Sequence, residues 1–442
     1  MTGMSLRTVV FGLILSLVCV RAAHARTDFP GMLPASAERA ASVAPAPPAD
    51  TLPAAPADPF PAAVSADTLS AAAFPAPADS LGATAAAPAR KRSFVRRIID
   101  YFGESTQDRT FEKKIDFTFA GGPSYSKNTS LGIGILAAGL YRLDRTDSVT
   151  VPSDISLYAN VSVSGFYSVG IEGNTIFAHN RQRVDYTLEF SSAPTYTWGI
   201  GYNDVQKDDK RSYTEQRYEI KARYLREILP HAYIGGLLSF DHAQASKYDG
   251  EPPLFGDQRL RYTTTGLGLT VEYDSRDFIP NPFKGIYLSF QNIFYPKGLG
   301  TCDKLLQRMT FTADFYQRVW TDCILAFDLY GEFNSSGTPW PMLARMGGNQ
   351  RMRGYYKGQY TDNDLITAQI ELRQRVWRRI GCVAWAGAGN VFPTFREFDW
   401  AETLPNYGFG LRWELKKRVN IRLDYGFGKK TDSFLLSINE AF

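Results

Sequence analysis

The 442-residue chain has only four histidines and four cysteines, and after its first twenty residues it has no long apolar run. A membrane-spanning helix needs about 20 consecutive apolar residues, so the sequence excludes a helical membrane protein. His179, His231 and His242 fall in no metal-ligand spacing, and no nucleophile motif or phosphate-binding loop is present. We therefore expect no metal, no cofactor and no enzymatic activity.

The formal net charge is only +4, which gives no support for nucleic-acid binding. Cys302, Cys323 and Cys382 contain no CxxC pair. In the strand order given below, Cys302 lies at the outer rim, and the other two lie at the inner rim, two strands apart. Two strand spacings amount to about 9–10 Å, whereas a disulfide needs Cα atoms within about 7 Å, so we expect free cysteines.

The N-terminal segment has a basic residue at Arg7, an apolar run from Val9 to Val20, and the small-residue site Ala23-His24-Ala25. This order is typical of a secretory signal peptide, which we place at residues 1–25. Residues 26–89 are rich in alanine and proline and have no periodicity. Such a composition buries too little apolar surface to fold, so it predicts a disordered periplasmic tether.

Residues 90–106 differ in composition from the preceding segment, because apolar and basic residues occur there at helical spacing. The apolar positions are Phe94, Val95, Ile98, Ile99 and Phe102. This pattern predicts a short basic amphipathic helix. One interpretation is that it lies on anionic head groups or packs under a barrel, and the other is a frayed linker helix. Residues 26–106 are also the expected contact with periplasmic or outer-membrane protein partners.

From residue 110 to residue 442 the chain alternates between apolar and polar positions. In one segment Ile421 and Leu423 alternate with Arg422 and Asp424. Charged residues on a regular face would destabilise a dry core, but they suit a water-filled lumen whose outer face contacts lipid. The pattern predicts an all-β protein with a transmembrane β-barrel. A soluble β-sandwich is the alternative, and it would carry fewer charges on the second face.

Sixteen segments show this alternation. They are 114–123, 131–143, 155–164, 166–176, 181–192, 212–226, 231–243, 263–275, 284–295, 305–317, 322–333, 364–378, 380–390, 404–416, 418–428 and 432–442. An even number of antiparallel strands is typical of bacterial outer-membrane barrels, which have short periplasmic turns and long outer loops. Short connections near Pro230, Asp322, Arg379 and Arg418 should therefore be periplasmic, and 193–211, 244–262, 334–363 and 391–403 should be outer loops.

Four segments in this order carry a family resemblance. They are Tyr273-Asp274-Ser275-Arg276-Asp277, Met352-Arg353-Gly354-Tyr355, Glu371-Leu372-Arg373 and Gly387-Ala388-Gly389-Asn390-Val391-Phe392. The region resembles the bacterial surface antigen family, the sixteen-stranded barrels of outer-membrane assembly and translocation proteins (BamA/TamA type). The resemblance implies a Gram-negative outer-membrane barrel in contact with lipid and lipopolysaccharide. It implies a subunit or accessory of an insertion or translocation machine. The alternatives are a passive solute pore or structural barrel, and a surface protein that binds through its outer loops.

The sequence departs from the family in two places. An acid usually helps to hold the loop arginine where this chain has Gly387, so Arg353 would depend on Glu371 or on an unidentified acid. Members that assemble other proteins usually carry folded periplasmic repeats, which residues 26–89 are too poor in apolar residues to form. The chain therefore resembles a stand-alone barrel.

Two sites follow from these motifs. Arg353 should fold inward and meet Glu371 in the lumen, where the receiving strand also carries Arg373. Gly354 would allow the loop to turn tightly, and Tyr355 would pack against the wall. The alternative is a solvated outer loop.

The second site is the seam between the first strand, with Gly121, Gly122 and Pro123, and the last strand, with Phe442. Proline offers no amide to a ladder, so the seam should be short and weak. The alternative is that the glycines only relieve crowding. The turn motif Tyr273, Asp274, Arg276 and Asp277 predicts a periplasmic turn held by ion pairs. The alternative is that Asp274, Arg276 and Asp277 form an acid–base cluster.

Overall fold

The computed structural model describes residues 110–442, apart from 208, 251–254, 280 and 417. The expected signal peptide, the tether at 26–89 and the basic helix at 90–106 lie outside the described residues. None of the helices in the described part of the chain is long and apolar enough to cross a bilayer.

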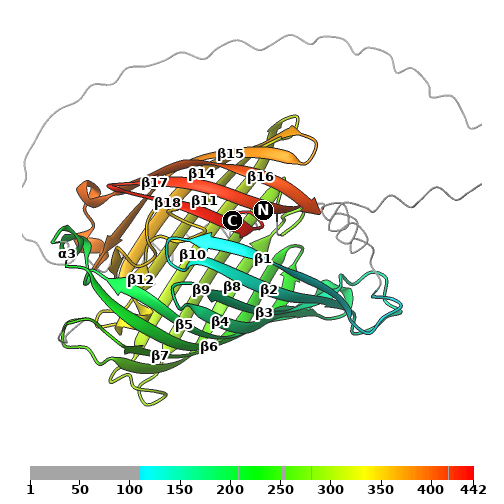
Figure 1. The fold of residues 1–442 in the computed structure, drawn as a ribbon. Helices are drawn as coiled ribbons and strands as arrows, with labels where there is room; N and C mark the ends of the chain where they lie inside the picture. Colours follow the sequence, from blue (N-terminus) through cyan, green and yellow to red (C-terminus); the bar gives the residue numbers. More distant parts are fainter. Residues whose placement is uncertain (1–109, 208, 251–254, 280, 417) are drawn as a thin grey trace, which may run out of the picture. The chain divides into compact units, whose positions relative to one another are not determined.

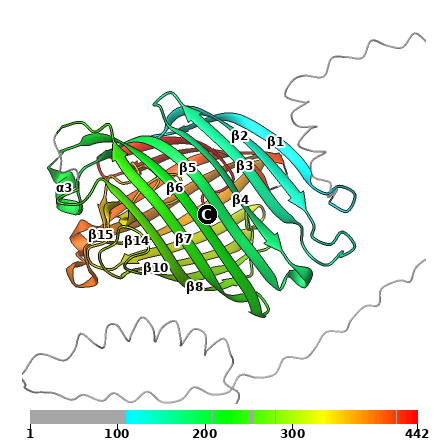
Figure 2. The same ribbon diagram turned by 90° about the horizontal axis from the view of Figure 1, so that it is seen from below.

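The described residues form a closed barrel of sixteen antiparallel strands, which confirms the predicted fold (Figures 1 and 2). The strands are β1 (Asp116–Ser126), β2 (Ser130–Tyr141), β3 (Ser153–Ser162), β4 (Tyr167–Ile176), β5 (Gln182–Thr197), β6 (Arg211–Leu229), β7 (Ala232–Ser246), β8 (Arg261–Asp274), β9 (Gly285–Tyr295), β10 (Leu306–Trp320), β11 (Cys323–Asn334), β14 (Asp364–Trp377), β15 (Ile380–Phe392), β16 (Leu404–Lys416), β17 (Val419–Gly428) and β18 (Thr431–Ile438). Each coincides with one predicted segment, with ends moved by a few residues.

Short elements lie in the connections between the strands. They are η1 (Ala178–Asn180), α3 (Tyr202–Gln206), η2 (Trp340–Met342), the two-residue strands β12 (Ala344–Arg345) and β13 (Thr361–Asp362), η3 (Phe395–Glu397) and η4 (Trp400–Glu402). β12 pairs with β13 and forms the base of the long connection between β11 and β14.

The alternation along β8 shows why these segments form a wall between two environments. Leu267 and Leu269 point outward and are 56% and 65% exposed, whereas Thr270 and Glu272 point inward and are almost fully buried. Glu272 accepts hydrogen bonds from Arg183 on β5 and Arg223 on β6, so its charge is paired inside the barrel. The exposed apolar face fits lipid, and the paired polar face fits the lumen.

The two ends of the barrel differ in their connections. We call the end with the two-residue connections 230–231, 321–322 and 378–379 the turn rim, and the opposite end, with residues 335–363, the loop rim. By the usual orientation of such barrels, the turn rim faces the periplasm. The expected pattern of short turns at the turn rim and long loops at the loop rim is wrong beside the seam. The loop rim has short connections there, at 127–129, 163–166 and 429–430, and the turn rim has a longer one at 142–152.

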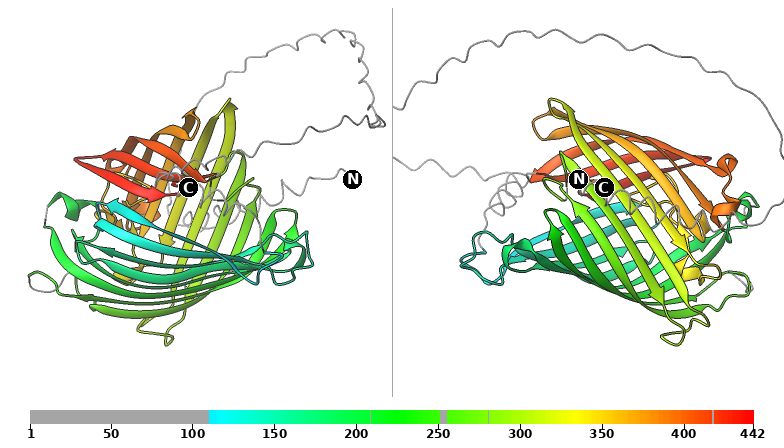
Figure 3. Two further views of the ribbon diagram at one scale, coloured as in Figure 1. Left: turned by 45° about the vertical axis from the view of Figure 1, so that its right-hand side comes forward. Right: turned by 180° about the vertical axis from the view of Figure 1, so that it is seen from behind.

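The barrel closes through a very short seam. β1 pairs with β18 through a single pair of facing residues, Tyr125 and Leu436, whereas eleven pairs join β1 to β2. Pro123 lies two residues from this pair, where its missing amide cannot extend the ladder. Figure 3 shows β1 in cyan and β18 in red at the edges of the wall. Most of β1, including Gly121 and Gly122, therefore has no strand on its seam side within the described residues.

Phe442 is not a seam residue, and the predicted last strand 432–442 is too long. β18 ends at Ile438, and Asn439 has a positive φ of 67° that turns the chain away from the wall. The ring of Phe442 then lies 6.3 Å from the ring of Tyr316 on β10, and its carbonyl accepts a hydrogen bond from Arg373. The correction has a physical cause: Glu440, which reads as an outward position in the strand pattern, turns inward to pair with Arg412.

Cys302, Cys323 and Cys382 are free. Cys302 lies in the connection between β9 and β10 at the loop rim, and the other two lie near the turn rim, as the strand order predicts. Cys323 is buried and Cys382 is exposed.

Candidate functional site

The connection 335–363 folds back into the barrel, and its segment Met352-Arg353-Gly354-Tyr355 is buried there. Arg353 is 0% exposed, and Met352 and Tyr355 are each 1% exposed. Arg353 cannot be left in such a place without partners, because a buried unpaired charge costs several kcal/mol. Its environment therefore defines the site.

Arg353 is held by two carboxylates from different strands. Its Nη1 donates to Asp424 on β17 at 2.8 Å, and its Nη2 donates to Glu371 on β14. The ring of Trp385 on β15 lies 3.6 Å from the guanidinium carbon, within the range of a cation–π contact. Both carboxylates are fully buried, so the three charges form one desolvated group. Such pairs are geometrically specific because the planar guanidinium fixes the direction of each donor.

The loop backbone approaches β17 closely at Gly354. Its φ is +118°, a value that favours glycine, and a Cβ there would lie 2.9 Å from the backbone of Gly426 and Phe427. On the other side of the contact, a Cβ at Gly426 would lie 2.4 Å from the carbonyl oxygen of Arg353. Glycines on both chains therefore allow the arginine to reach its acids. Asn406 on β16 donates to the same Arg353 oxygen and orients the peptide.

A second arginine anchors the loop to another strand. Arg351 donates to both oxygens of Asp328 on β11 at 2.6–2.9 Å. Gln369 on β14 donates to Asp328 and to the carbonyl of Gln350, which ties the same point of the loop to a further strand. The motif is therefore clamped by β11, β14 and β17, three strands on one side of the barrel.

Breaking the Arg351 clamp is expected to destabilise the protein. Arg351→Met leaves the fully buried Asp328 without a cation, whereas Arg351→Met combined with Asp328→Asn removes both charges. We expect the single change to cost about 1–3 kcal/mol and the double variant to recover part of it. Urea unfolding of the purified protein in detergent measures the free energy of unfolding of these variants and of Asp328→Asn alone. If the costs of the two single changes simply add up in the double variant, the two side chains do not form a stabilising pair.

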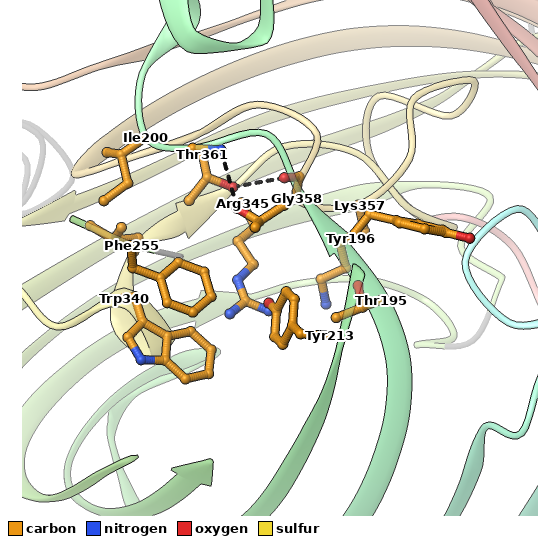
Figure 4. A pocket seen from close by; sticks show the side chains of 13 residues that line it. Thr195, Tyr196, Ile200, Tyr213, Phe255, Trp340, Arg345, Lys357, Gly358 and Thr361 are labelled. Atoms are coloured by element: carbon orange, nitrogen blue, oxygen red, sulfur yellow. Dashed lines mark hydrogen bonds between the residues drawn. The ribbon is translucent and has the colours of Figure 1, made fainter. Parts of the chain in front are cut away.

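The opposite side of the loop contacts the far wall. Tyr356 hydrogen-bonds to Thr195 on β5 at 3.0 Å, and Arg345 pairs with Glu215 on β6 at 2.8 Å. Figure 4 shows Arg345 between the rings of Trp340 and Tyr213. The loop therefore bridges the lumen from wall to wall, and this contact network gives it few alternative positions.

The loop also holds both edges of the seam. Asn128, in the hairpin between β1 and β2, exchanges two hydrogen bonds with the backbone of Lys357. In the hairpin between β17 and β18, Thr431 donates to the carbonyl of Gly354, and the amide of Lys429 donates to the Tyr355 hydroxyl. The single strand pair of the seam is thus supplemented by the loop at the loop rim.

The turn motif forms ion pairs at the turn rim. Arg276 donates twice to Asp274 at 2.8–2.9 Å, and Arg418 of the β16–β17 turn donates to Asp277 at 2.6 Å. Burial raises the pKa of the Asp277 carboxyl, but Arg418 and the amides of Phe283 and Lys284 outweigh it and hold the pKa below its ordinary value. Since β8–β9 and β16–β17 are not neighbours in the barrel, this ion pair draws the turn across the mouth.

The structure brings together most of the residues singled out in the sequence. Arg353, Gly354, Tyr355, Glu371 and Arg373 meet in the lumen, where Arg373 donates to Glu371 at 2.7 Å. Tyr273 lies apart from the ion pairs, with its ring 6.4 Å from that of His231.

Sequence reasoning missed Asp424, Asp328 and Trp385. Asp424 replaces the acid that the family pattern suggested at Gly387, which lies opposite Gln369 and Asn406. The alternation had already placed Asp424 on the inward face, so the available signal was an inward acid on a strand near the seam. No local pattern connects Arg351 with Asp328.

These features define a class of protein: a sixteen-stranded outer-membrane β-barrel whose long outer loop inserts an arginine into the lumen. The model of the Omp85 superfamily domain matches residues 158–442, and the chain belongs to this superfamily. Together with the fold, this membership identifies an assembly- or translocation-type barrel of the Gram-negative outer membrane.

Solved structures show the same fold. BamA from Haemophilus ducreyi lacking POTRA domains 1–3 matches with a TM-score of 0.50 and 10% identity, over 76% of this chain and 77% of that one. CdiB from Acinetobacter baumannii matches with a TM-score of 0.51 and 13% identity, over 74% of this chain and 60% of that one. CdiB from Escherichia coli matches with a TM-score of 0.52 and 13% identity, over 74% and 63%. The chain thus spans less than two thirds of the CdiB chains. A search of curated proteins finds no match.

Proposed function

We propose that the protein is a subunit or accessory of a machine that inserts proteins into the outer membrane or moves them across it. One observation carries the proposal: β1 meets β18 through a single residue pair, which leaves most of its edge unpaired. An exposed strand edge is a template for an incoming strand, because its amide and carbonyl groups need partners in lipid. The seam is therefore the expected place of client entry.

The inserted loop supports this proposal through its position. Because residues 335–363 contact both seam hairpins, movement of the loop would change the support of both edges together. The Arg353 pairs hold the loop in the closed arrangement. An incoming strand would add to β1 by β-augmentation, in which main-chain hydrogen bonds supply the affinity.

The other contacts in the proposal concern lipid and protein partners. The outward face of the strands contacts outer-membrane lipid, and lipopolysaccharide at the loop rim. Residues 26–106, outside the described part of the chain, remain the proposed contact for periplasmic or outer-membrane partners. The chain is proposed to act without folded periplasmic repeats of its own.

Depletion of the protein followed by outer-membrane proteomics tests the proposal. We expect other outer-membrane barrels or surface proteins to fall in abundance, while inner-membrane proteins, which serve as the internal control, stay constant. An unchanged outer-membrane proteome, together with steady conductance of the purified protein in a planar bilayer, would instead assign it to the passive pores. Recovery of the proteome by a plasmid copy excludes effects on neighbouring genes.

A further inference from the structure

A cavity with an excess of arginine lies at the turn rim, inside the mouth of the barrel. Its volume is about 70 Å³, and it is bounded by β10, β11 and β14 to β17 and by Asn281 and Phe283 of the β8–β9 turn. A single water needs about 10–15 Å³ of such space, so the cavity has room for a small polar group rather than one solvent molecule. Six arginines line it: Arg318, Arg373, Arg375, Arg378, Arg379 and Arg412.

The carboxylates in the lining are fewer, and they are already engaged. They are Asp322, Glu414 and Glu440. Glu440 accepts from Arg412 and Asn420 at 2.7 Å each, and Asp322 lies 3.9 Å from Arg375. The cavity therefore keeps a positive excess that its own acids do not neutralise.

Two of the arginines present buried donors without partners. Arg373 and Arg412 are each 5% exposed. Within the described residues, Nη1 of Arg373 and Nη2 of Arg412 have no hydrogen-bond partner. The other nitrogens of Arg373 donate to Glu371 and to the carbonyl oxygen of Phe442, and those of Arg412 donate to Glu440 and Asp424. A buried donor without a partner costs about 1–3 kcal/mol, so an oxyanion here would satisfy groups that the fold leaves open.

Two further arginines at the cavity are accessible. Arg318 and Arg378 are exposed and have no carboxylate partner among the described residues, and their contacts are with the rings of Phe283 and Trp377. Together with the buried pair, they form a path of positive charge from the periplasmic mouth into the barrel. Such a path raises the local concentration of anionic ligands and steers them inward.

We propose that this cavity binds the carboxylate side chains of an acidic, extended peptide segment of a partner protein on the periplasmic side. The guanidinium fork matches a carboxylate in two parallel hydrogen bonds. Lining residues on the lumen face, such as Ile324 and Val383, place the site inside the mouth rather than on the lipid-facing wall, which favours a peptide over a lipid head group. The inference goes beyond the proposed function, because the site does not use the free edge of β1.

Fluorescence anisotropy of the purified full chain in detergent tests the site. The probes are a labelled peptide of alternating glutamate and serine and the same peptide with glutamine in place of glutamate. We expect the glutamate peptide to bind, to weaken as salt rises, and to lose about tenfold or more in affinity with Arg318→Gln and Arg378→Gln combined. The glutamine peptide should not bind. Both substitutions are at exposed positions, so the barrel should remain folded, which its heat-modifiable migration on a gel checks.

A matched control removes the same charge at the other end of the barrel. Lys247→Gln combined with Arg396→Gln affects two exposed residues of the loop rim and should leave peptide affinity unchanged. Equal loss of affinity in this control would overturn the site in favour of general surface charge, and so would equal binding of the two peptides. Displacement of the glutamate peptide by inorganic phosphate at far lower concentration than by acetate would overturn the carboxylate assignment in favour of a phosphate ligand.

Discussion

Replacing Arg353 by methionine is expected to destabilise the barrel by about 3–5 kcal/mol, because two buried carboxylates then lose their shared cation. Glu371 keeps Arg373 and Asp424 keeps Arg412, but both lose the charge that joins them to the loop. The methionine side chain is close in length and flexible, so packing is altered less than charge. Equilibrium unfolding in urea, followed by tryptophan fluorescence in lipid vesicles, measures the effect.

Three variants make the result specific to the charge. Arg396→Met, at an exposed loop position, should change stability by no more than about 0.5 kcal/mol. Arg353→Lys keeps the charge but has no planar fork. Its loss of stability should therefore lie between those of Arg396→Met and Arg353→Met. In a Glu371→Gln background, Arg353→Met should cost less than in the wild type, because one of the two buried acceptors of the guanidinium is then neutral. An equal loss of stability in both backgrounds would show that this pairing is not the reason for the effect.

Locking the seam is expected to abolish the activity under the proposed function. Tyr125→Cys and Leu436→Cys face each other across the single pair of the seam, and opposed Cα atoms in antiparallel strands lie about 4.5–5.5 Å apart, within disulfide range. After Cys302, Cys323 and Cys382 are replaced by alanine, the oxidised protein should reproduce the depletion phenotype completely. Reduction with dithiothreitol should restore the outer-membrane proteome.

The control for the lock is a disulfide in the intact ladder. Phe119→Cys with Ala137→Cys joins β1 to β2 within their eleven-pair register and should leave function unchanged. A locked seam that supports normal protein levels would show that β1 and β18 do not need to separate. In that case the free edge of β1 would be a structural feature only.

The strands were predictable from the sequence because each one separates lipid from lumen. Along β8 the exposed Leu267 and Leu269 and the buried Thr270 and Glu272 reproduce the alternation residue by residue. A period of two fixes both the strand and its inward face, since a shift by one residue would place Glu272 in lipid. The inward position of Glu371 followed from the same rule.

The partners across the lumen were not predictable in the same way. Asp424 and Asp328 are inward acids on strands, as the alternation indicates, but the pattern contains no distance between non-neighbouring strands. Which acid meets Arg353 depends on how the loop turns at Gly354 and where Gly426 gives it space. The end of the last strand was wrong for a related reason: pairing with Arg412 overrides the local pattern at Glu440.

The unequal lengths of the strands have a consequence for the surrounding lipid. β18 has 8 residues, whereas β6, on a distant part of the wall, has 19. A tilted strand needs about 9–11 residues to cross the hydrocarbon core of a bilayer, so β18 is too short and β6 is more than long enough. Acyl chains beside β18 must shorten or disorder to meet it, and this hydrophobic mismatch thins the bilayer on one side of the protein. Under the proposed function, this thinning would ease the entry of a new strand at the seam.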